Sequence, residues 1–140
     1  MPIRVVLDSS VLVAALRSQL GASFRLLHAL RVGRYEIALS VPLVLEYEAS
    51  LLRHAEQLGL SATEVTALVD YLCSVGVGQQ IHFLWRPSLH DPRDEFVLEL
   101  AVAAACQAIV THNTRDFTGT DRFGVEVLTP GQFLRRLEEG

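Results

Sequence analysis

Four acidic residues of this sequence are spaced so that their side chains could meet in one crevice. Asp8 ends a short β-branched run at residues 3–7, and Asp116 follows a second such run at residues 108–111. Runs of this kind are typical of buried strands, and parallel strands would bring both acids to the carboxyl edge of one sheet, where open α/β sheets bind ligands. Glu46 falls one turn into the helix expected after a strand at residues 35–41. Asp94 opens a later helix, and reaches this edge only if the loop before it crosses there.

Carboxylates brought this close repel one another unless a cation lies between them. Oxygen ligands of this kind suit Mg²⁺ or Mn²⁺, with water and a substrate phosphate completing the coordination. The four acids therefore predict a metal site whose cation could take a substrate phosphate as a further ligand.

Two of these acids also have purely structural interpretations. Asp8 could cap the helix that follows it. Asp91 is well placed as the N-cap of the helix that begins with Pro92, and Asp94 would then be its capping-box partner. Asp91 is thus either a cap or an additional acid of the site.

The other two acids leave similar alternatives open. Glu46 and Glu48 could be ordinary solvated residues of a helix surface, and the residues alone leave open which of them joins the site. Asp116 could close an Asx-type turn with Asn113. Each signal is weak alone, so the prediction depends on the joint placement of the acids.

Other chemistries find no support in the sequence. The five histidines share no short spacing that is typical of a zinc site, and His112 is interpreted as an exposed loop residue near the crevice that could touch substrate. No G-x-x-x-x-G-K-[ST], G-x-G-x-x-G or G-x-S-x-G run occurs, which argues against nucleotide cradling by a glycine loop and against a hydrolase nucleophile elbow.

Expected strands alternate with expected helices along the chain. The strands fall at residues 3–7, 35–41, 80–85, 108–111 and 125–128. The helices fall at residues 11–16, resuming after Gly21, and then after Pro42, at residues 61–72 with a Ser61/Glu64 capping box, at residues 96–106 and from Pro130. This order predicts a three-layer α/β/α sandwich with a mostly parallel five-stranded sheet, in a single domain of residues 1–140. The helix at residues 96–106 is apolar nearly all round, which predicts close packing on both sides.

The composition is that of a globular protein. The 140 residues are 50% hydrophobic and 20% charged, enough to bury a core. No apolar run reaches the length of a membrane span, and the N-terminus lacks a leader pattern, so we expect a cytoplasmic protein. Cys73 and Cys106 lie in apolar helical contexts and are expected to be buried, reduced thiols.

The net charge of −4 would normally argue against a nucleic-acid partner. If four of the sixteen acids bind metal, twelve remain against twelve basic residues, all of them arginine. A neutral shell around a local acidic site is compatible with an enzyme that acts on a phosphodiester.

Taken together, these residues resemble the PIN domain family. The resemblance rests on Asp8-Ser9-Ser10-Val11, on Glu46, on Asp94 seven residues before Ala101, and on Thr111-x-Asn113-x-x-Asp116-Phe117, and it spans residues 5–128. The Asp-Pro-x-Asp run of residues 91–94 is similar to that of a group of bacterial PIN toxins from type II toxin–antitoxin pairs.

The resemblance implies a Mg²⁺- or Mn²⁺-dependent endoribonuclease that cleaves single-stranded or structured RNA. By this resemblance Asp8, Glu46, Asp94 and Asp116 are the acidic, metal-binding set, and Glu46 fits better than Glu48. Ser10 and Asn113 match the polar residues that orient water or a carboxylate, and Thr111 matches the hydroxyl residue at the end of the fourth strand. Candidate phosphate contacts are Arg17, Arg93 and Arg115.

The resemblance also implies a homodimer that is held inactive by an antitoxin protein. The helices at residues 11–30 and 43–52 are candidates for these surfaces, unless their apolar residues belong only to the core. A catalytically silent PIN-like domain that binds a protein or RNA is the alternative. A phosphotransfer or receiver-like domain would expect a second acid where Ser10 stands or a lysine at the site, and the chain has no lysine.

Overall fold

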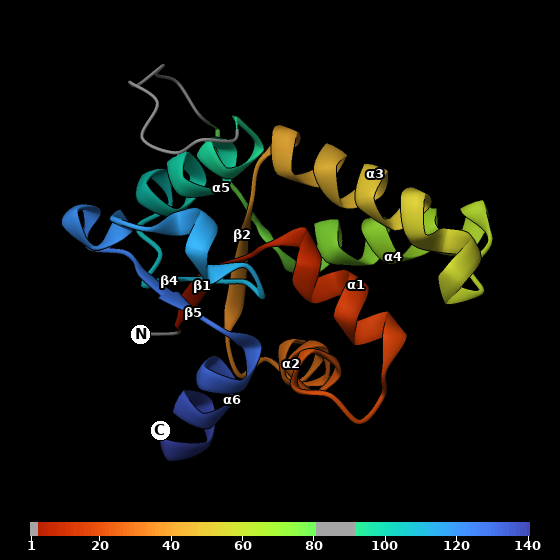
Figure 1. Cartoon of the computed structure of the whole chain (residues 1–140), viewed down its shortest axis with the longest axis horizontal. Coiled ribbons are helices and arrows are strands. Elements are labelled where there is room, and N and C mark those ends of the chain that lie inside the picture. Colours follow the sequence, from red (N-terminus) through yellow and green to blue (C-terminus); the bar gives the residue numbers. More distant parts are fainter. Residues whose placement is uncertain (1–2, 81–91) are drawn as a thin grey trace.

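The computed structural model describes residues 3–80 and 92–140, except for the side chains of residues 92 and 93 (Figure 1). The elements in chain order are β1 (Arg4–Leu7), α1 (Ser9–Arg17), α2 (Ala22–Arg31), β2 (Glu36–Leu39), α3 (Val41–Leu58), α4 (Ala62–Val75), β3 (Val77–Gly78), α5 (Pro92–Ala103), β4 (Ala108–Val110), the 3₁₀ helices η1 (Thr114–Phe117) and η2 (Thr120–Phe123), β5 (Glu126–Leu128) and α6 (Pro130–Glu139).

The five strands form one sheet in the order β3-β2-β1-β4-β5, and every neighbouring pair is parallel. Val5 in the central strand pairs with Ile37 on one side and with Ala108 on the other. The chain builds the sheet outward from β1 through β2 and β3, and then returns to add β4 and β5 on the opposite side. The sheet thus has its topological switch point between β1 and β4, the position at which such sheets bind ligands.

Helices cover both faces of this sheet, which confirms the predicted α/β fold class. Figure 1 shows α5 on one side of the sheet and α1, α3 and α4 on the other. Val5, Val6 and Leu7 of β1 are fully buried because β1 lies at the centre of the sheet and between the layers. Among the described helices, none is long and apolar enough to cross a membrane.

Helix α3 carries part of the site, and its boundaries follow from local chemistry. The Ser40 hydroxyl accepts a hydrogen bond from the backbone N–H of Leu43, and Pro42 lies in the first turn, where a missing N–H costs nothing. Gly59 ends the helix with a left-handed φ of 71°, which favours glycine. The capping box predicted for α4 is also present, because Ser61 and Glu64 exchange hydrogen bonds.

The third strand that the structure describes lies before the predicted range of residues 80–85. Its residues are Val77 and Gly78, Gln80 belongs to no strand, and residues 81–85 lie outside the described residues. Only Gly76 separates the end of α4 from the start of β3. A side chain would not fit at this position, because a Cβ on Gly76 would lie 2.4 Å from the Leu39 Cδ1 atom of β2. Gly76 is therefore part of a close approach between the end of α4 and β2.

Two burial predictions were wrong. Phe96 on α5 is 43% exposed, so that helix packs on one side only at this position, although Val97, Leu98, Leu100 and Ala101 are buried. Cys73 is exposed, whereas Cys106 is buried as expected. Burial is decided by which helix face meets the sheet, and a helix that is apolar all round does not reveal that face.

Candidate active site

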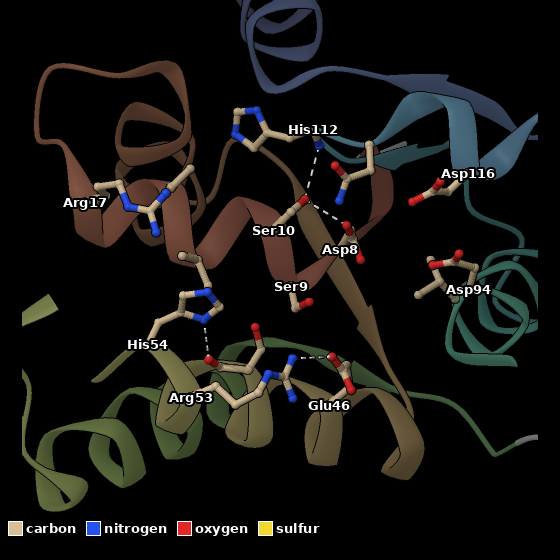
Figure 2. Close-up of a pocket in the computed structure, with 15 residues that line it drawn as sticks. Asp8, Ser9, Ser10, Arg17, Glu46, Arg53, His54, Asp94, His112 and Asp116 are labelled. Carbon is tan, nitrogen blue, oxygen red and sulfur yellow. Dashed lines mark hydrogen bonds and ion pairs between the residues drawn. The ribbon is translucent and has the colours of Figure 1, made fainter. Parts of the chain in front are cut away.

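A cavity of about 560 Å³ lies at the carboxyl edge of the sheet, beside the switch point. Side chains from α1, α3, α5 and the segment after β4 line it (Figure 2). The lining includes all four acids that the sequence singled out, namely Asp8, Glu46, Asp94 and Asp116. Ser10, Asn113 and His112 also line it, and Thr111 contacts Asp8 from below the surface.

Asp8 takes the N-cap position of α1, but its side chain makes no capping hydrogen bond. Instead, the hydroxyl groups of Ser10 and Thr111 both donate to the Asp8 Oδ2 atom, each at 2.7 Å. Capping was therefore the wrong interpretation of this carboxylate. No hydrogen bond to Oδ1 exists among the described residues, so that oxygen is available to a ligand in the cavity.

The two hydroxyls are themselves oriented by backbone N–H groups. His112 N–H donates to Ser10 Oγ at 3.1 Å, and Asn113 N–H donates to Thr111 Oγ1 at 3.0 Å. Each hydroxyl accepts one hydrogen bond and directs its own proton to Asp8. Hydrogen bonds to a charged acceptor are the stronger kind, so this arrangement holds the carboxylate in one orientation. Figure 2 shows the chain of contacts from His112 through Ser10 to Asp8.

Glu46 is brought to the cavity by its neighbour Tyr47. The Tyr47 hydroxyl is fully buried and donates to the backbone carbonyl of Leu7, the last residue of β1. Burial, and secondly the charge of Asp8, raise the pKa of Tyr47, so the phenol stays protonated and remains a donor. This contact ties α3 to the end of β1. Glu48 is exposed and does not line the cavity, which leaves Glu46 as the acid of this helix at the site.

Asp94 and Asp116 complete the acidic end of the cavity. Asp94 lies in the first turn of α5, and Asp116 lies in η1. The turn before Asp116 is closed by its backbone N–H, which donates to the Asn113 carbonyl at 3.0 Å, and the Asn113 side chain does not cap η1. The Asx-turn alternative is therefore not what the structure has. Asp91 lies outside the described residues.

The surroundings of these acids reduce the electrostatic repulsion between their carboxylates. Asp8 and Asp94 each lie at the amino end of a helix, where the helix dipole favours negative charge. Glu46 is partly neutralised by Arg53, whose Nη2 lies 3.4 Å from Glu46 Oε1.

The donor set of the cavity fits Mg²⁺ or Mn²⁺. The cavity offers carboxylate, hydroxyl and amide oxygens together with the imidazoles of His54 and His112, and its described lining has no thiol. Among residues 3–80 and 92–140, no three acids, histidines or cysteines lie close enough to form a closed cage. Mg²⁺ does not need such a cage, because it is usually held by one or two carboxylates and keeps several waters.

The cavity also contains four basic residues, two of which the sequence analysis missed. Arg17 was a candidate and does line the cavity, whereas Arg115 does not, and the Arg93 side chain lies outside the described residues. Arg53 and His54 were not predicted. The sequence did carry a signal for them, because residues seven and eight positions after Glu46 lie on the same face of a helix as Glu46.

A family model described as the PIN domain matches residues 4–115, which is most of the chain. The chain belongs to the PIN domain family. PIN domains are typically metal-dependent nucleases. The match includes Asp8, Glu46 and Asp94 and stops one residue before Asp116. No curated protein matches this chain.

Proposed function

We propose that this PIN domain is a Mg²⁺- or Mn²⁺-dependent endoribonuclease that hydrolyses phosphodiester bonds of RNA, preferentially in single-stranded segments. One observation carries the proposal: four acids from four separate elements line the cavity at the sheet's switch point. A cavity of about 560 Å³ admits a single strand more readily than a duplex, whose bases are already paired.

The side chains of the cavity would have different roles in binding and orienting a cation. Asp8 offers Oδ1 to the cation while Ser10 and Thr111 hold Oδ2. Asp94, Asp116 and Glu46 contribute further oxygen ligands or hold the waters around the cation, and Asn113 positions water at the rim. When bound, the cation would lower the pKa of the attacking water and offset the charge that builds on the phosphate.

The toxin role is part of the same proposal. We infer that the chain acts as the toxin of a toxin–antitoxin pair, as a homodimer in the cytoplasm, with an antitoxin that covers the acidic cavity. Most apolar residues of α1 belong to the core, including Val11, Leu12 and Val13. Exposed apolar side chains that remain for partner contacts are Leu20 and Phe24 near the start of α2 and Leu45 and Leu52 on α3.

A silent module that binds a protein or RNA is the second candidate. The observation that favours it is the spread of the carboxylates, since no compact group of three exists among the described residues. This candidate predicts RNA or protein binding without cleavage.

The deciding experiment is cleavage of a mixed-sequence single-stranded RNA in Mg²⁺, Mn²⁺ or EDTA. The Asp8→Asn variant should lose cleavage and keep its fold, because removing one of several repelling acids relieves strain and asparagine still accepts the two hydroxyl protons. Asp70→Asn is the matched control, as Asp70 is exposed on α4 and away from the cavity.

Metal-dependent cleavage that is lost only in Asp8→Asn would support the nuclease. Wild-type cleavage by Asp8→Asn would contradict the assignment of the site. No cleavage by any variant would favour the silent module. Growth arrest on expression that requires Asp8 would support the toxin role over housekeeping RNA processing.

A further inference from the structure

The cavity is polarised along its length. Figure 2 shows Asp94 and Asp116 on one side of Asp8, and Arg17 and His54 on the opposite side. Arg17 lies in the last turn of α1, is exposed and has no ion pair among the described residues. A strand that carries a phosphate on every nucleotide would be repelled by an all-acidic cavity, so a positive end would attract the strand's backbone phosphates.

The positive end is built by two helices that run side by side. Helices α1 and α3 lie next to each other and extend in the same direction away from the acids (Figure 1). Arg17 follows Asp8 by nine residues and His54 follows Glu46 by eight, which places each basic residue roughly 12 Å further along its helix. Both basic residues therefore lie about two turns from the acidic end.

His54 is held in a defined orientation. Its Nδ1 atom lies 2.8 Å from the Ser50 carbonyl oxygen, and a carbonyl only accepts, so Nδ1 carries a proton and donates. The Nε2 atom is an acceptor in the neutral ring and donates to a phosphate oxygen when the ring carries its second proton. Arg53, on the same face, is engaged with Glu46. Arg17 thus carries the positive charge that no described acid offsets.

We propose that Arg17 and His54 bind a backbone phosphate of the RNA strand roughly three nucleotides from the phosphate that is cleaved at the acids. This rests on the proposed function, because it assumes that the strand enters the acidic end. The separation follows from the helix positions and is an upper bound, since a strand stacked as in duplex DNA advances about 3.4 Å per nucleotide and an unstacked strand advances further. A guanidinium is suited to the contact because it donates two parallel hydrogen bonds to one phosphate.

The test is RNA binding as a function of length, measured by fluorescence anisotropy with single-stranded oligonucleotides of three to ten nucleotides in Ca²⁺, which takes the same oxygen ligands as Mg²⁺ and keeps the acidic end neutralised. Arg17→Ala is compared with Arg31→Ala, which removes the same charge from the last turn of α2, outside the cavity. Wild type and Arg31→Ala should bind more tightly once the strand spans both ends. Arg17→Ala should bind long strands about fivefold more weakly, bind the shortest strands as wild type does, and lower the salt dependence by about one ion. His54→Gln should show a smaller loss in the same direction.

Cleavage kinetics in Mg²⁺ provide the second readout. Arg17→Ala should raise KM on long strands with kcat unchanged, because the contact lies away from the reacting phosphate. Equal behaviour of Arg17→Ala and Arg31→Ala would overturn the phosphate subsite even if the nuclease is confirmed. A kcat loss on the shortest strands would also overturn it, by placing Arg17 at the reacting phosphate.

The two proposals can fail separately. If no RNA is cleaved and the length-dependent binding still requires Arg17, the nuclease is wrong and the phosphate subsite stands. If the wild-type protein binds no oligonucleotide and cleaves none, both are wrong.

Discussion

Replacing Thr111 by valine should show how much the site depends on the orientation of Asp8. Thr111 is fully buried directly after β4, and its hydroxyl donates to Asp8 Oδ2 at 2.7 Å. Valine keeps the branched shape and removes only the hydroxyl. The Asn113 N–H that loses its acceptor belongs to an exposed residue, so water can replace that bond.

The expected effects follow from the charge of the acceptor. A hydrogen bond to a charged group contributes roughly 1.5–3 kcal/mol, and Asp8 lies at a cavity that water reaches, so we expect a loss of about 1.5 kcal/mol in the free energy of unfolding. Loss of a group that orients a metal ligand typically weakens metal binding about 10- to 100-fold. We expect Mn²⁺ affinity and cleavage to fall within that range.

Thr120→Val is the matched control. Thr120 is also buried, at 3% exposure, but its hydroxyl donates to the neutral carbonyl of Val125, away from the cavity. This variant should lose about 1 kcal/mol of stability and bind Mn²⁺ as wild type does. Urea denaturation in EDTA gives the stability of each variant, and titration calorimetry gives the affinity.

A Thr111→Val variant that matches wild type in both measurements would refute the reasoning, because the hydroxyl would then not hold the carboxylate. A stability loss with unchanged Mn²⁺ affinity would refute the part that assigns Asp8 to the metal.

Two further predictions concern other parts of the molecule. Arg53→Gln should tighten Mn²⁺ binding up to about fivefold, because it removes a half-exposed ion-pair partner that competes with the cation for Glu46. An ion pair of this kind contributes roughly 0–1 kcal/mol. Weaker Mn²⁺ binding by calorimetry would contradict this and would mean that Arg53 orients Glu46. A disulfide exchange reagent at pH 8 should react at once with the exposed thiol of Cys73 and with Cys106 only after unfolding. The reason is that burial raises the pKa of the Cys106 thiol to about 11. Equal reaction rates of the two thiols in the folded protein would contradict this.

The fold class and the meeting of Asp8 with the segment after Thr111 could be predicted from the sequence because both follow from local patterns. The buried strand ending at Asp8 and the strand before Thr111 are contiguous β-branched runs, and parallel strands place their ends at one edge. The capping box of α4 was predicted for a similar reason, as Ser61 and Glu64 contact each other within one turn.

The tertiary structure decided every question that depends on which elements meet. It placed Glu46 and not Glu48 at the cavity, because the Tyr47 hydroxyl ties α3 to the end of β1. It directed the Asp8 carboxylate to hydrogen bonds other than a helix cap, because the Thr111 hydroxyl, 103 positions later and directly after β4, donates to it. It also moved the third strand to Val77, since the close approach of Gly76 to Leu39 has no local signature.

The basic end of the cavity shows the same division. The sequence alone determined that Arg53 and His54 share a helix face with Glu46, because helical periodicity is local. That Arg17 of another helix faces the same cavity was decided by the packing of α1 against α3, which joins residues far apart in the chain through contacts that no local pattern specifies.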